Sequence, residues 1–160
     1  NQFTVLLPFK IPSITPQKIS KEKAIPGNYD HLAGNKILVV EDNKINQLVV
    51  AKMLRKLNME VTTANDGLLA LEEFEKQNFD LVLMDIQMPN MDGYRTTAEI
   101  RKHADPRRRE IPIIALTASA FLTEKEKAKL FGMNDHVGKP FGPDELLDKI
   151  SNLLEIQKSA

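Results

Sequence analysis

Acidic side chains follow two of the aliphatic runs in this chain. Glu41 and Asp42 come directly after Ile37–Val40, and Asp85 comes directly after Leu81–Met84. Continuous aliphatic runs of this length are typical of strands that are buried on both faces of a parallel sheet. If the two strands are neighbours, three carboxylates meet at one edge of the sheet, where they repel one another unless a cation joins them.

The residue types in the chain limit which cation this could be. There is no cysteine, which excludes disulfides, thiolate metal sites and cysteine nucleophiles. Carboxylate oxygens without a histidine pair suit a hard cation such as Mg²⁺, or Mn²⁺. A carboxylate beside such an ion can also attack phosphorus and form an aspartyl phosphate.

Two further polar residues stand at the ends of apolar runs. Thr117 ends the run in "IPIIALTA", and Lys139 follows a weaker run in "DHVGKPFG". Each residue alone has an ordinary explanation, because Thr favours strands and a Lys-Pro pair is common in loops. Asp42 alone could be a turn former or a helix cap. Together, the ends of four strands carry three acids, a hydroxyl and an ammonium. This combination favours phosphate chemistry.

Short apolar runs alternate with stretches of helical period from Lys36 onward. The runs are Ile37–Val40, Val61–Ala64, Leu81–Met84, Ile113–Leu116 and His136–Val137. The helical rows between and after them are Ile45, Leu48, Val49, Met53 and Leu57; Ala70, Leu71 and Phe74; Tyr94, Thr97, Ala98 and Ile100; Phe121, Leu122, Ala128 and Phe131; and Leu146, Leu147, Ile150 and Leu154. Five strands alternating with five helices predict an α/β fold with a parallel sheet. The second run is more polar and is expected at an edge of the sheet.

Composition sets the broad class of protein. The chain has 160 residues, with 22 Lys and Arg against 22 Asp and Glu, so its formal net charge is zero. Nothing global therefore directs it to nucleic acid or to an anionic membrane. No apolar run approaches the roughly 20 residues of a membrane span. We expect a cytoplasmic protein without direct nucleic-acid or membrane contact, and "HADPRRRE" is expected to be a solvated loop.

The first 34 residues differ from the rest. They hold four of the nine prolines, which favour an extended linker over helix or central strand. Only "FTVLLPF" alternates like a strand. The chain begins with Asn1, and we expect it to be a piece of a longer protein. The expected division is a remnant of a preceding domain with a Pro-rich linker (1–34), one α/β domain (35–157) and a tail (158–160).

Four motifs in register are similar to those of a known family. "ILVVEDNKINQ", "LVLMDIQMPNMDG", "IIALTA" and "GKP" resemble the receiver domain of two-component response regulators, from about Lys36 to Glu155. The resemblance implies a flavodoxin-like (βα)5 doubly wound sheet of strand order 2-1-3-4-5. It also implies that Asp85 accepts a phosphoryl group from a partner's phosphohistidine, with Lys139 contacting that group.

The same resemblance assigns the remaining site residues. Glu41 and Asp42 would hold Mg²⁺ together with Asp85 and the backbone carbonyl of Gln87, and Thr117 would be the switch hydroxyl. His136 stands where the family often has Tyr or Phe, and is expected to move inward with Thr117 on phosphorylation. Gln87 and Ser119 would flank the path of the hydrolytic water and tune dephosphorylation. The Lys139–Pro140 bond is a candidate cis peptide.

Other features are similar to those of receivers fused to hybrid sensor histidine kinases. "EDNKINQ" and "GMNDHVGKP" resemble such receivers, and "FTVLLPFKIP" resembles the closing strand of a kinase ATP-binding domain. The resemblance implies a C-terminal receiver whose partner is a histidine kinase dimerisation domain, a histidine phosphotransfer protein, or both. The fragment itself would catalyse only its own aspartyl phosphorylation and dephosphorylation.

Two alternatives stay open. A metal-dependent phosphatase could use Asp85 as its nucleophile, although Gln87 stands where such enzymes usually carry a second acid. A receiver that works only as a phosphorylation-independent scaffold is also possible, although it would be expected to lack an acid or the lysine.

Overall fold

The computed structural model describes residues 28–118 and 122–159. One sheet of five parallel strands runs through it in the order β2-β1-β3-β4-β5. The strands are β1 (Lys36–Val40), β2 (Glu60–Ala64), β3 (Leu81–Asp85), β4 (Ile113–Thr117) and β5 (Asp135–Gly138). The predicted strand order is confirmed, and the polar strand β2 lies at an edge as expected. The strand expected in "FTVLLPF" lies outside the described residues.

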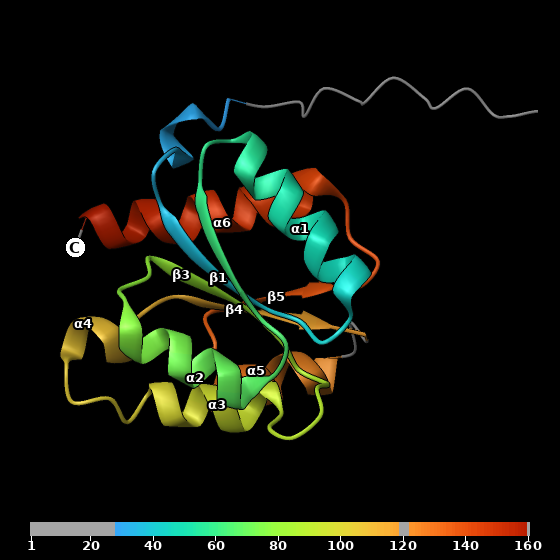
Figure 1. Ribbon diagram of the computed structural model, residues 1–160, viewed down its shortest axis with the longest axis vertical. Helices are drawn as coiled ribbons and strands as arrows, with labels where there is room; N and C mark the ends of the chain where they lie inside the picture. Colours follow the sequence, from blue (N-terminus) through green and yellow to red (C-terminus); the bar gives the residue numbers. More distant parts are fainter. Residues whose placement is uncertain (1–27, 119–121, 160) are drawn as a thin grey trace, which may run out of the picture.

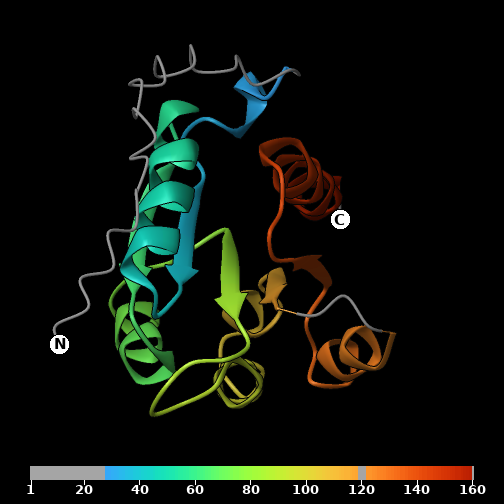
Figure 2. The same cartoon turned by 90° about the vertical axis from the view of Figure 1, so that its right-hand side faces the viewer.

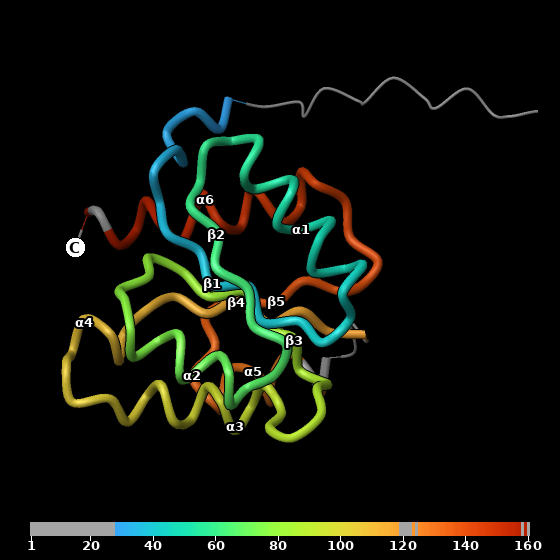
Figure 3. Tube along the Cα trace, in the orientation of Figure 1, coloured from blue at the N-terminus to red at the C-terminus, as the bar shows by residue number. Residues whose placement is uncertain are grey.

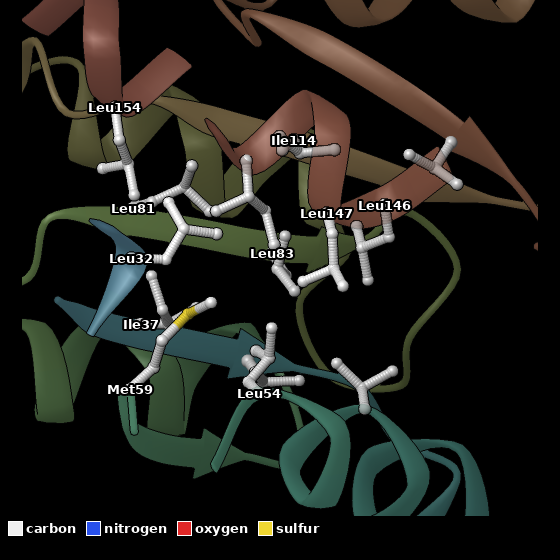
Figure 4. Packing of buried hydrophobic residues seen from close by; sticks show 14 of the residues in the cluster. Leu32, Ile37, Leu54, Met59, Leu81, Leu83, Ile114, Leu146, Leu147 and Leu154 are labelled. Carbon is white, nitrogen blue, oxygen red and sulfur yellow. The ribbon is translucent and has the colours of Figure 1, made fainter. Parts of the chain in front are cut away.

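Helices cover both faces of the sheet (Figure 1, Figure 2). The helices α1 (Lys44–Lys56) and α6 (Pro143–Ser159) lie on one face, and α2 (Gly67–Lys76), α3 (Gly93–Ile100) and α5 (Leu122–Leu130) lie on the other. Because side chains alternate along a strand, β3 sends Leu81 and Leu83 to the first face and Val82 and Met84 to the second. Figure 4 shows Leu81 and Leu83 packed beside Leu54 and Leu147 on the first face.

Helix α1 forms where its apolar row predicts, but much of that row faces solvent. Ile45, Leu48 and Val49 are 74%, 65% and 62% exposed. The buried side is instead formed by Gln47, Val50, Ala51 and Leu54. The row therefore identifies the helix, whereas its orientation follows from which side packs on the sheet.

The segment expected to be a solvated loop contains a one-turn helix, α4 (Pro106–Arg109). Asp105 caps it through the amide of Arg107. Arg108 is only partly exposed, because its guanidinium donates to the carbonyls of Phe74 and Gln77 at 2.6 and 2.9 Å and lies over the Phe74 ring. This arginine binds carbonyls at the C-terminal end of α2, which corrects the expectation for that position.

The residues just before β1 pack onto the domain. Tyr29 and Leu32, the latter in the 3₁₀ turn η1 (Asp30–Leu32), are buried in the cluster beneath α6. The Tyr29 hydroxyl donates to Asp148 Oδ1 at 2.7 Å. These two core residues precede the expected boundary between residues 34 and 35, so the packed domain begins earlier than expected. At the other end, α6 extends to Ser159, into the expected tail. The division into kinase remnant and receiver stays a prediction.

The Tyr29–Asp148 contact predicts a pH dependence. The hydrogen bond to Asp148, burial and the negative charge of Asp148 raise the pKa of Tyr29 from 10.0 to about 12. Because the folded pKa lies above the unfolded one, the resulting stabilisation is complete below pH 10.0 and is lost as pH rises toward 12. In a Tyr94→Phe background, ultraviolet titration should show the pKa of Tyr29 falling toward its ordinary value in Asp148→Ala. An unchanged titration would contradict the contact.

Candidate functional site

Three carboxylates meet at the carboxyl edge of the sheet. Glu41 follows β1, and Asp85 is the last residue of β3, its neighbour in the sheet. Glu41, Asp42 and Asp85 each offer an oxygen within 4.8 Å of the others. In Figure 3 the turns that follow β1 and β3 lie near one another at this edge, on the right of the trace. Glu41 and Asp85 are buried and Asp42 is exposed, so the predicted convergence is confirmed.

Lys139 reaches this cluster from the loop after β5. Its Nζ donates to Glu41 Oε2 at 2.6 Å and to Asp85 Oδ2 at 2.7 Å. The Lys139–Pro140 peptide bond is cis, as the resemblance implied. The backbone amide of Lys139 donates to the carbonyl of Thr117 at 2.6 Å, which connects the ends of β5 and β4. The ammonium therefore lies between two buried acids from two different strands.

One ammonium does not fully compensate these acids. Burial raises the pKa of Asp85, and the charge of Glu41 raises it further, although the hydrogen bond and charge of Lys139 act against both. Burial alone would lower the pKa of Lys139, but its hydrogen bonds to Asp85 and Glu41 and their charges outweigh burial and raise it. The lysine thus stays charged, while the carboxylates retain excess negative charge that a further cation would stabilise.

The other expected site residues lie around this cluster. Thr117 is buried as the last residue of β4, the strand that pairs with β3. The backbone amide of Gln87 donates to Asp85 Oδ1 at 3.2 Å, and Gln87 lines a pocket of about 420 Å³ together with Asp42. His136 is half-buried in β5, and its Nδ1 lies 3.5 Å from Asp135 Oδ1. Ser119 lies outside the described residues.

Two amides of α1 complete the surroundings of Glu41, and the sequence reasoning missed both. Asn46 Nδ2 donates to Glu41 Oε1 at 3.2 Å. Gln47 Nε2 donates to the backbone carbonyls of Glu41 and Ala64 at 3.1 and 3.0 Å. The signal that could have found Gln47 is a polar residue next to the apolar positions of a helix that directly follows the acids. These bonds fix the strand end that carries Glu41.

The donor set fits a hard divalent cation. All three candidate ligands are carboxylates, and oxygen ligands are those that Mg²⁺ prefers. The excess negative charge at Asp85 and Glu41 gives such an ion a favourable electrostatic position. Within residues 28–118 and 122–159, this is the one group of acidic and histidine side chains that meets the geometry of a metal site.

Comparisons with known proteins agree with this geometry. Residues 37–151 match the family described as the response regulator receiver domain. The chain is 38% identical over 141 residues to the sensor histidine kinase RcsC of Escherichia coli K12, and 44% identical over 107 residues to the hybrid signal transduction histidine kinase G of Dictyostelium discoideum. These alignments cover 88% and 66% of this chain, but only 14% and 3% of the two kinases.

A solved structure is similar over the whole domain. It is the receiver domain of the sensor histidine kinase PA1611 from Pseudomonas aeruginosa PAO1, with a magnesium ion coordinated in the active site cleft. The identity is 44% and the TM-score is 0.70, over 77% of this chain and 99% of that one. Among the described residues of the present chain, no helix has the length and apolar character needed to cross a membrane.

Proposed function

The chain belongs to the response regulator receiver family, and from this we propose that Asp85 accepts a phosphoryl group from a partner's phosphohistidine in a Mg²⁺-dependent reaction. One observation carries the proposal. The Asp85 carboxylate is buried at the sheet edge, receives a hydrogen bond from the Lys139 ammonium at 2.7 Å, and lies with two further acids within reach of one cation. The parent protein would be a hybrid sensor histidine kinase that contains this receiver.

The residues divide the chemistry among them. The Asp85 carboxylate attacks phosphorus, a P–O bond forms, and the P–N bond to the donor imidazole breaks. Lys139 neutralises charge on the transferred group, and Asp42, Glu41 and the Gln87 carbonyl would hold the metal ion with Asp85. When bound, Mg²⁺ supplies charge neutralisation and orientation of the phosphoryl oxygens. This assignment uses every charged group in the cluster.

We propose that Thr117 and His136 transmit the phosphorylated state. Thr117 is buried beside Asp85 at the end of β4, and His136 belongs to the adjacent edge strand β5. A phosphoryl group on Asp85 would draw the Thr117 hydroxyl toward its oxygens, and the half-buried imidazole would move into the space released. These movements would change the surface of β5 through a shift in the populations of its conformations. Gln87 and Ser119 are proposed to tune the return reaction.

An apolar surface beside the cluster supports a protein partner. The exposed side chains of Ile45, Leu48 and Val49 lie on one side of α1, at helical spacing. A pocket of about 380 Å³ joins this surface to the cluster, lined by Glu41, Asn46, Val49, Val50, Ala118, Lys139, Pro140 and Phe141. We infer that the histidine-bearing domain of a kinase, or of a phosphotransfer protein, docks here with its histidine directed at Asp85.

Replacing Leu48 with glutamate should affect only the reaction with a protein donor. Leu48→Glu places a charge on the apolar surface, and we expect phosphotransfer from a phosphorylated histidine phosphotransfer protein to slow by about tenfold, the effect of about 1.4 kcal/mol. Phosphorylation by a small donor should keep its rate. Ile156→Glu is the matched control, because Ile156 has the same 65% exposure on α6. Equal transfer rates in both variants would contradict docking at α1.

The function itself is tested by intact-mass measurement after exposure to a small phosphoramidate or acyl phosphate. One phosphoryl adduct is expected in Mg²⁺ and none after chelation of the metal. An adduct that forms equally well in chelator would contradict metal dependence. Absence of an adduct under every condition would favour the scaffold alternative, and release of phosphate from many external esters would favour the phosphatase.

A further inference from the structure

The loop between β3 and α3, residues 86–92, follows the proposed phosphoacceptor and carries Gln87. Its two ends are held locally. At the start, the Gln87 amide donates to Asp85 Oδ1 at 3.2 Å. At the end, the Gly93 amide donates to the Ile86 carbonyl at 3.0 Å. The middle of the loop is held by a different part of the chain.

That part is the N-terminus of α2. Asp66 caps this helix, because its Oδ1 accepts a hydrogen bond from the Leu69 amide at 2.9 Å. Its second oxygen, Oδ2, accepts a hydrogen bond from Asn90 Nδ2 at 2.8 Å. In addition, the Gly67 amide donates to the Met91 carbonyl at 3.2 Å. A single carboxylate therefore caps a helix and holds the site loop.

The surroundings show that this contact is built into the fold. Asp66 is 8% exposed. The hydrogen bonds from the Leu69 amide and from Asn90 lower the pKa of its carboxyl, because they stabilise the ionised form. Asn90 has a φ of +63°, a conformation that Asn tolerates better than most residues. A Cβ atom at Gly67 would lie 1.9 Å from Thr96 Oγ1 and 2.8 Å from the Met91 carbonyl. The loop and α2 are thus in contact with no space between them.

We propose that Asp66 and Asn90 are positioning residues of the phosphorylation site, which set the distance of the 86–92 loop from the carboxylates of β1 and β3. This inference rests on the proposed function, since it assigns the loop carbonyl of Gln87 to the metal. Mg²⁺ requires near-octahedral geometry with ligands at about 2.0–2.1 Å, so small displacements of one ligand weaken binding. Asn90 lies three residues after Gln87, with Pro89 between them restricting the backbone.

Two variants separate this role from helix capping and from charge. Asp66→Ser keeps an oxygen that can accept from the Leu69 amide but removes the acceptor for Asn90. Asn90→Gly keeps the positive φ, removes the amide donor and leaves the net charge unchanged. Asp105→Ser is the matched control, because Asp105 caps α4 in the same way, through the Arg107 amide, and lies outside the site.

The readouts are Mg²⁺ affinity by calorimetric titration and hydrogen exchange of the 86–92 amides in metal-free protein. Both variants should weaken Mg²⁺ binding by roughly 3- to 10-fold, the factor that one net hydrogen bond is worth. Both substitutions should speed hydrogen exchange in the loop. The double variant should bind Mg²⁺ no more weakly than the single variant that binds it more weakly. Asp105→Ser should change neither quantity.

The outcomes distinguish this inference from the proposed function. If the natural chain binds Mg²⁺ and takes up a phosphoryl group, but Asp66→Ser and Asn90→Gly bind Mg²⁺ as tightly as it does, the positioning role is overturned. A change in thermal stability alone, with unchanged Mg²⁺ affinity and loop exchange, also overturns it and leaves only a structural cap. If the natural chain binds no Mg²⁺ and forms no adduct, the proposed function fails first.

Discussion

Asp85→Asn takes up no phosphoryl group from either a small donor or a phosphohistidine protein, if Asp85 is the acceptor. The amide has nearly the shape of the carboxylate but is not a nucleophile toward phosphorus, so P–O bond formation stops. The substitution also removes one of the three acids that share the cluster. Mg²⁺ binding should therefore weaken as well. Intact mass and Mg²⁺ titration on the same preparation measure both effects.

The matched control residue lies at the opposite end of β3 from Asp85. Asp80 precedes β3, and its Oδ2 accepts a hydrogen bond from the Lys36 amide at 2.6 Å. Asp80→Asn makes the same chemical change away from the carboxyl edge, and its adduct should form at the rate of the natural chain. An adduct of undiminished yield on Asp85→Asn would place the acceptor elsewhere in the chain.

Lys139→Met lowers the free energy of unfolding of the metal-free protein by about 2 kcal/mol. This loss is smaller than the loss expected on breaking a fully buried ion pair, because the lysine side chain keeps some solvent contact. The reason is that Glu41 and Asp85 lose their shared cation, and two buried carboxylates then face each other. Mg²⁺ should restore much of the loss, because it binds the folded state. Phosphorylation by a small donor should slow by about 10- to 100-fold, since one charge no longer stabilises the transferred group.

Denaturant unfolding with and without Mg²⁺ measures the first effect, and the rate of adduct formation measures the second. Lys149→Met is the control, because the Lys149 ammonium lies 2.7 Å from Asp135 Oδ1 with a similar side-chain exposure, 26% against 21% for Lys139. Its stability loss should be below about 1 kcal/mol and independent of Mg²⁺. A Lys139→Met protein with unchanged stability and rate would exclude the lysine from the site.

The sequence by itself determined the sheet and much of the candidate site. Aliphatic runs at regular spacing identify strands from local residues alone, and the polar β2 run correctly indicates an edge. Because parallel strands share one carboxyl edge, the residues that end them must lie together once the strand order is known. Glu41, Asp42, Asp85 and Lys139 were accessible in this way, since each position depends on a neighbouring run and not on distant contacts.

Only the tertiary structure decided which faces and partners these elements use. The apolar row of α1 marks a helix, yet Ile45 and Val49 point to solvent because the opposite side packs on the sheet. Arg108 binds helix α2, Tyr29 binds α6, and Asn90 binds Asp66, across sequence separations of 31 to 34, 119 and 24 residues. Such hydrogen bonds form where the folded backbone brings distant side chains together. No local sequence pattern indicates which of the distant residues will meet.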